Sequence, residues 1–107
     1  MRFYALDLAL LIISRLRDVL PAIARCDARL HKQLREAGSS IALNLGEGSR
    51  RRGRDRRFLY SVASGSAEEV RTGLRVALSW GYVPEKAVSE TLDDIDRLQR
   101  ILWKLIG

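Results

Sequence analysis

Hydrophobic residues recur at intervals of three and four along almost the whole chain. The clearest stripe runs from Leu30 to Leu45, where Leu30, Leu34, Ala37, Ile41 and Leu45 share one face of a helix over about four turns. Similar stripes run from Phe58 to Leu78 and from Val88 to Leu105, whereas the segment from Phe3 to about Ala24 is apolar around more of its circumference. No stretch alternates in the manner of a strand, so the pattern predicts an all-α protein.

Breaking and capping residues separate the first three helices. Pro21 predicts that the first helix bends or stops there, and Asp27 is a suitable N-cap for the second helix. The second helix should end between Ser49 and Arg52, with Gly53 in the turn and Asp55 near the start of the third helix.

The last helix is delimited in the same way. Gly81 should end the third helix, and Pro84 fits the first turn of the fourth, followed by Glu85 where the helix dipole favours an acid. Because the links are short, consecutive helices should be antiparallel. The chain, residues 1–107, is therefore expected to be a single domain with the architecture of an up-down-up-down four-helix bundle.

Composition excludes several classes of protein. The 107 residues include one cysteine, Cys26, and one histidine, His31, so neither an internal disulfide nor a multi-histidine metal site can form. His31 lies off the apolar stripe and is expected at the solvated surface. The apolar run Leu8–Ile13 is too short to cross a membrane, and the charges around it do not fit a secretory signal. We expect a cytoplasmic protein without a membrane segment.

Candidate catalytic and metal-binding motifs are weak. Gly46-Glu47-Gly48 follows a predicted helix instead of the strand that a phosphate loop requires. The acids of the last helix lack the Glu-x-x-His pairs of dimetal bundles and are expected to form a solvated face; they are Glu90, Asp93, Asp94 and Asp96. We therefore predict no catalytic residue, no metal, no cofactor and no enzymatic activity.

Charge gives the strongest indication of function. The chain carries a net charge of +6, which divides into +7 over residues 1–57 and −1 over residues 58–107. Most of the excess lies in a cluster that is offset only by Asp55: Arg50, Arg51, Arg52, Arg54, Arg56 and Arg57. Such a cluster either solvates a turn or binds a polyanion, and we favour the backbone of RNA or DNA. The alternative is a protein-interaction scaffold that docks an acidic partner.

Aromatic residues near the cluster bear on sequence preference. Phe58 is expected in the core, which leaves Tyr60 as the only nearby ring that could stack on a base. We therefore expect little discrimination among nucleic-acid sequences.

A set of polar residues adjoins the inward stripes of the second and third helices. Its members are Ser40, Asn44, Glu47, Ser66 and Glu69. An antiparallel hairpin centred near Gly53 would place Ser40 opposite Gly65 or Ser66, and Asn44 opposite Ser61 or Val62. We favour a structural polar layer, which fixes the register of the two helices, over a ligand site.

Three segments within residues 30–83 resemble a known family. They are Ser40–Gly48 (SIALNLGEG), Ala63–Glu69 (ASGSAEE) and Gly81-Tyr82, and Gln33 and Arg35 precede them. They resemble the four-helix-bundle proteins encoded in intervening sequences of bacterial 23S ribosomal RNA genes, in which Ser-Ile-x-x-Asn-Ile-Ala-Glu-Gly, Ala-x-Gly-Ser-x-x-Glu and Gly-Tyr are typical. This chain departs from the pattern at Leu45-Gly46, where Ile-Ala is usual, and at Arg35, which is one place early.

The resemblance implies an assembly and possible partners. Members of the family form homopentameric rings, and the accessory variability protein of diversity-generating retroelements resembles them. That protein is a basic pentamer that binds nucleic acid and a reverse transcriptase, so the resemblance implies a homopentamer of about +30 net charge and a possible reverse transcriptase partner. The apolar residues of the first helix are too many for one buried stripe, which also indicates a homo-oligomer; they are Phe3, Leu6, Leu8, Leu10, Leu11, Ile12 and Ile13.

Overall fold

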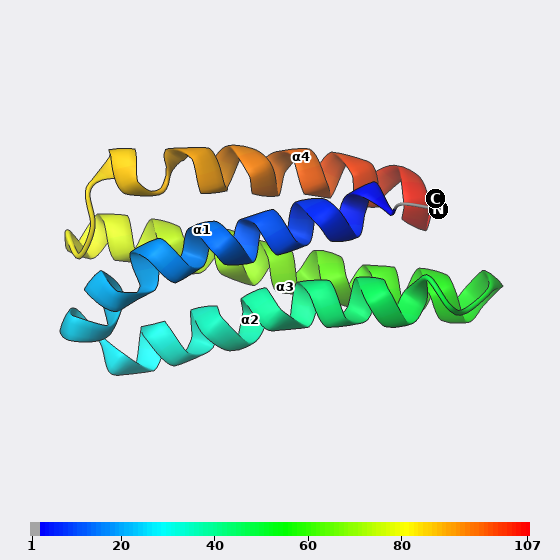
Figure 1. Ribbon diagram of the computed structural model, residues 1–107, viewed down its shortest axis with the longest axis horizontal. Helices are drawn as coiled ribbons and strands as arrows, with labels where there is room; N and C mark the ends of the chain where they lie inside the picture. The colour runs from blue at the N-terminus through cyan, green and yellow to red at the C-terminus, as the bar shows by residue number, and fades with distance from the viewer. Residues whose placement is uncertain (1–2) are drawn as a thin grey trace.

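Four long helices, joined by short links, account for most of residues 3–107, the part of the chain that this computed structural model describes. They are α1 (Tyr4–Cys26), α2 (Ala28–Gly48), α3 (Gly53–Trp80) and α4 (Ser89–Ile106), with a 3₁₀ turn, η1 (Glu85–Ala87), before the last helix. Consecutive helices run antiparallel, and α1 also packs against α4, which closes a bundle of 42 × 22 × 21 Å (Figure 1). Residues 3–107 contain no strand, and the predicted all-α four-helix bundle is confirmed.

Most of the predicted helix boundaries are close to those of the structure. The Asp27 carboxylate accepts a hydrogen bond of 3.0 Å from the Leu30 amide, so Asp27 is the N-cap of α2 as predicted. Gly81 ends α3 with a left-handed φ of 78°. The helix α1 continues through Pro21 to Cys26, and Pro21 is exposed, so water can reach the carbonyl group that the proline leaves without a donor.

The start of the last helix differs from the prediction. Pro84 precedes the 3₁₀ turn η1 instead of lying in the first turn of α4. Val88 follows with φ −125° and ψ −8°, outside the helical region, and α4 begins only at Ser89. The Val88 side chain is fully buried, so packing of this residue interrupts the helix that Pro84 and Glu85 would otherwise begin.

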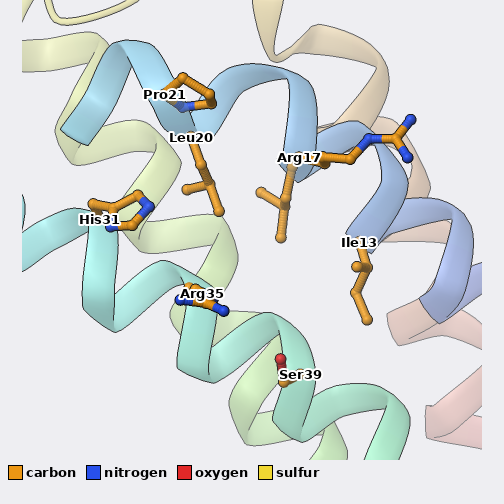
Figure 2. A pocket seen from close by; sticks show the side chains of 8 residues that line it. Ile13, Arg17, Leu20, Pro21, His31, Arg35 and Ser39 are labelled. Atoms are coloured by element: carbon orange, nitrogen blue, oxygen red, sulfur yellow. The ribbon is translucent and has the colours of Figure 1, made fainter. Parts of the chain in front are cut away.

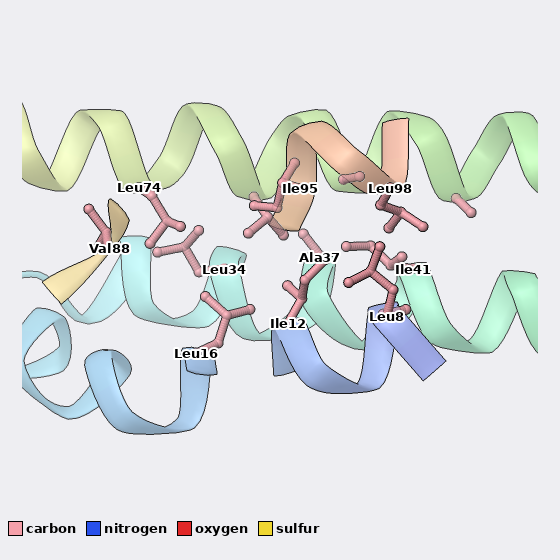
Figure 3. Packing of buried hydrophobic residues seen from close by; sticks show 14 of the residues in the cluster. Leu8, Ile12, Leu16, Leu34, Ala37, Ile41, Leu74, Val88, Ile95 and Leu98 are labelled. Carbon is pink, nitrogen blue, oxygen red and sulfur yellow. The ribbon is translucent and has the colours of Figure 1, made fainter. Parts of the chain in front are cut away.

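One hydrophobic core occupies the length of the bundle. Ile12 from α1, Ala37 and Ile41 from α2, and Ile95 and Leu98 from α4 point into the space between the helices (Figure 3). The third helix contributes a stripe of residues that are at most 4% exposed: Tyr60, Ala63, Ala67, Val70, Leu74 and Ala77. By contrast, Leu10 and Leu11 on α1 remain 48% and 41% exposed, which agrees with the expectation that one protomer cannot bury the whole apolar surface of this helix.

An ion pair joins the first helix to the last. The Arg15 guanidinium donates a hydrogen bond of 2.7 Å from Nε to Asp94, and its Nη1 lies 2.7 Å from a carboxylate oxygen of Glu90. The hydrogen bond to Asp94 raises the pKa of Arg15 above its ordinary value. Asp94 is only 5% exposed, so the prediction that the acids of α4 form a uniformly solvated face is wrong at this residue.

Candidate nucleic-acid interface

The turn between α2 and α3 forms one tip of the bundle. It extends beyond the nearby ends of α1 and α4, at the end of the molecule opposite to the other two links (Figure 1). Six of its residues are the predicted cluster, and we call the segment 49–57 the arginine tip; its arginines are Arg50, Arg51, Arg52, Arg54, Arg56 and Arg57. Every residue of the arginine tip is exposed, so the fold brings all six guanidinium groups to one end of the protein.

Most of these arginines have no acidic partner. Arg51 donates a hydrogen bond of 2.8 Å to Glu47, and Arg56 donates one of 3.3 Å to the Ser49 carbonyl oxygen. Among residues 3–107, no carboxylate lies within 4 Å of the other four, which are Arg50, Arg52, Arg54 and Arg57. Their charge is therefore available to an external anion.

The backbone of the arginine tip adds to its positive potential. Arg52 precedes α3 as its N-cap and makes no side-chain capping bond, so the first amide groups of α3 have no side-chain acceptor there. The positive end of the α3 dipole points in the same direction as the arginines. Asp55, in the first turn of α3, offsets part of this potential.

Local packing holds the base of the arginine tip in place. Gly48, the last residue of α2, lies against the ring of Tyr60, where an added Cβ would be only 2.7 Å from Cε1. The Ser49 hydroxyl donates a hydrogen bond of 2.8 Å to the Gly46 carbonyl oxygen, and the amide of Arg50 donates one of 3.1 Å to the Glu47 carbonyl oxygen. The contact between Gly48 and Tyr60 joins α2 to α3 below the turn, and the two hydrogen bonds close the C-terminal end of α2.

The two aromatic residues beside the arginine tip have the opposite roles to those predicted. Tyr60 is buried, with its ring 5.8 Å from that of Phe3, whereas Phe58 is 65% exposed. Side chains two positions apart in a helix point in directions that differ by about 200°, so only one of these two rings can face the core. The buried stripe of α3 begins at Tyr60, and Phe58 is left at the surface.

The polar layer is smaller than predicted. The hydroxyl groups of Ser40 and Ser66 lie 2.7 Å apart, in the predicted register, and the Asn44 amide donates bonds of 2.8 and 3.1 Å to the carbonyl and hydroxyl oxygens of Ser40. Glu47 and Glu69 are exposed and lie outside this layer. The Glu47 carboxylate pairs with Arg51, and Glu69 lines a groove between α2 and α3 together with Gln33.

Sequence reasoning did not identify a second polar link, between α3 and α4. The Ser64 hydroxyl donates a hydrogen bond of 2.8 Å to the side-chain oxygen of Gln99, whose amide donates one of 2.9 Å to the Ser64 carbonyl oxygen. The two residues are 35 positions apart, and no spacing within one helix connects them.

A groove of about 310 Å³ separates α1 from α2 at the other end of the bundle. Figure 2 shows Ile13 and Leu20 of α1 across this groove from His31 and Arg35 of α2. His31 is half-buried here, so the expectation of a fully solvated histidine is only partly correct. No group of three or more metal-ligating side chains occurs within residues 3–107, and no helix among these residues is long and apolar enough to span a membrane.

Comparisons with known proteins place the chain in a family. The family of 23S rRNA-intervening sequence proteins matches residues 4–104. No curated protein sequence matches the chain. The crystal structure of a protein with unknown function from the S23 ribosomal protein family of Bacteroides thetaiotaomicron has a TM-score of 0.89 at 19% identity, covering 96% of this chain and 98% of that one. That likeness concerns the fold, whereas the family match over residues 4–104 shows that the chain belongs to the 23S rRNA-intervening sequence protein family.

Proposed function

We propose that this protein binds the phosphate backbone of nucleic acid through its arginine tip and that it catalyses no reaction. The observation that carries the proposal is the group of four exposed arginines that have neither an acidic partner nor a side-chain hydrogen bond among residues 3–107. Guanidinium groups bind phosphate through two parallel hydrogen bonds, and neutralising a nucleic-acid backbone releases its condensed counterions. Both effects favour a polyanion.

The shape of the arginine tip favours nucleic acid over an acidic protein surface. Protein interfaces usually contain a desolvated apolar centre surrounded by polar residues. Of the exposed large apolar residues in the described part of the chain, Phe58 alone directly adjoins residues 49–57. Charge without an apolar centre suits a ligand whose own charge is regularly spaced along a backbone.

The test is the salt dependence of binding to a single-stranded RNA of mixed sequence. If the four unpaired arginines each neutralise one phosphate, the logarithm of the affinity should fall against the logarithm of salt concentration with a slope of about −3. Replacing Arg50, Arg52, Arg54 and Arg57 with Ala should weaken binding for every sequence and bring the slope close to zero. Any salt dependence that this variant retains should come from Arg51 and Arg56.

A control variant removes the same charge elsewhere. Arg25, Arg29, Lys32 and Lys86 are exposed and have no ion-pair partner within residues 3–107. They belong to the end of α1, the start of α2 and η1, which lie at the end of the bundle opposite to the arginine tip (Figure 1). Replacing these four with Ala should leave most of the slope intact. Equal losses in the two variants would mean that net charge, and not the arginine tip, determines binding. Absence of binding at low salt would favour the acidic protein partner.

We also propose that the protein functions as a homo-oligomer. Leu43 on α2 is 71% exposed, and Leu10 and Leu11 on α1 are 48% and 41% exposed, which leaves apolar surface on both helices. A pentamer, as the family resemblance implies, should give about five times the protomer mass of 12.1 kDa in light scattering at micromolar concentration. A measured mass of one protomer would contradict this proposal. Association with a reverse transcriptase stays a prediction.

A further inference from the structure

Phe58 is an exposed aromatic ring next to the arginine tip. It follows Arg57 directly, lies one helical turn after Arg54, and is 65% exposed. From this juxtaposition we infer that Phe58 stacks on an unpaired base, so that the protein prefers single-stranded nucleic acid to a duplex. This inference rests on the proposed function, because it assigns the kind of nucleic acid that the arginine tip holds.

The fold fixes Phe58 in this exposed position. At this level of α3 the Tyr60 side chain points into the core, where it contacts Gly48 and lies against Phe3. Phe58, two residues earlier, must then point away from the core. Among residues 3–107 the only close pair of aromatic rings is Phe3 with Tyr60, so the Phe58 ring is not stacked on another ring of the protomer.

Ser61 and Gly65 follow Phe58 along α3 at intervals of three and seven residues. The Ser61 hydroxyl turns back to donate a hydrogen bond of 2.9 Å to the Arg57 carbonyl oxygen. Gly65, nearly two turns after Phe58, is exposed, and a Cβ built there would meet no atom within 4 Å. The Phe58 ring itself is 65% exposed, so part of its surface is open to a base.

The combination of charge and ring selects a single strand. Arginines near Phe58 would hold the phosphates of a strand, while the ring would offer an apolar face to a base, as in single-strand binding grooves. In a duplex the bases of all internal pairs are stacked on both faces, and an isolated ring at the tip of a helical hairpin cannot reach between them. Phe58 should therefore contribute to the binding of single strands and not to that of duplexes.

The experiment compares a single-stranded RNA with a blunt duplex of the same length, using fluorescence anisotropy at fixed salt. Phe58→Ala should weaken binding of the single strand about tenfold and leave binding of the duplex unchanged. Because no charge is removed, the salt slope should not change. Trp80→Ala is the matched control, since Trp80 is 71% exposed but lies at the far end of the same helix, and it should bind as the unaltered protein does.

Two further variants distinguish stacking from simple apolar contact. Phe58→Trp should retain or increase binding of the single strand, whereas Phe58→Leu, which keeps an apolar side chain without a ring, should lose as much as Phe58→Ala. A single strand that carries 2-aminopurine should lose fluorescence on binding the unaltered protein, and this quenching should disappear with Phe58→Leu.

Each contrary result has a separate meaning. If the unaltered protein binds neither RNA, the proposed function itself fails. If it binds both and Phe58→Ala has no effect, or Phe58→Leu binds normally, only the stacking role is refuted. A change of oligomeric state in Phe58→Ala, measured by light scattering, would assign Phe58 to a contact between subunits and would also overturn the inference.

Discussion

Gly73 and Gly65 lie within the same helix, α3, but an added methyl group meets different surroundings at the two positions. At Gly73 a Cβ would lie 2.5 Å from Cδ2 and 3.1 Å from Cγ of Leu34. Leu34 is only 1% exposed and packs in the core, so it has little room to move. At Gly65 no atom lies within 4 Å of the added Cβ. The same substitution should therefore change stability in opposite directions.

Two effects determine how much each substitution changes the free energy of unfolding. Replacing glycine with alanine inside a helix stabilises it by about 1 kcal/mol, because alanine loses less conformational entropy. Gly65→Ala should therefore raise the free energy of unfolding by about 1 kcal/mol. Overpacking a tight core costs about 1 to 3 kcal/mol, so Gly73→Ala should be between about 0 and 2 kcal/mol less stable than the unaltered protein. The two variants should then differ by roughly 1 to 3 kcal/mol.

Urea unfolding followed by circular dichroism measures this difference. With an m-value of roughly 1.5 kcal/mol per M, a difference of 2 kcal/mol separates the two midpoints by about 1.3 M. Both variants should be unfolded at one protein concentration, because any coupling between unfolding and assembly then affects them equally. A midpoint for Gly73→Ala equal to or above that of Gly65→Ala would refute the argument that Leu34 leaves no space at Gly73.

The other predictions concern polar groups. Asp94→Ala should lower the urea midpoint more than Asp93→Ala does, because Asp94 is buried against Arg15 whereas Asp93 is exposed. Asn44→Leu should destabilise by about 1 kcal/mol by removing the hydrogen bonds that this side chain donates, and an unchanged midpoint would show that these bonds contribute nothing. Burial, followed by a hydrogen bond to a carboxylate, raises the pKa of Tyr82 above 10.0, so its contribution to stability is complete below about pH 10 and is lost as the pH rises through the folded-state pKa. Tyr82→Phe should reduce this alkaline loss, which unfolding midpoints between pH 8 and pH 11 would measure.

Local patterns were sufficient to predict the helices. Spacings of three and four residues, the N-cap Asp27 and the terminal Gly81 depend on neighbours in the sequence, and the structure agrees with each of them. The register of α2 against α3 was also predictable, because the link is short enough for Ser40 to meet Ser66.

Features that depend on distant residues were not predictable. Phe58 and Tyr60 are both aromatic, and the choice between them depends on the space beside Gly48 and Phe3, which no spacing within α3 reveals. The burial of Asp94 depends on Arg15, which is 79 residues away. The arginine cluster alone was sufficient to predict the location of the candidate site, but it did not predict that the Phe58 ring beside it is exposed.

The separation of the arginine tip from the core has a consequence for how the protein can evolve. Residues 49–58 are all exposed, so substitutions there should change folding stability by less than about 0.5 kcal/mol each. Gly53 is the exception, because its left-handed φ of 56° disfavours any residue with a side chain. Helix packing therefore places little constraint on the identity of these side chains. The bundle can act as a constant frame, and the affinity and ligand preference of its tip can be altered by mutation at little risk to the fold.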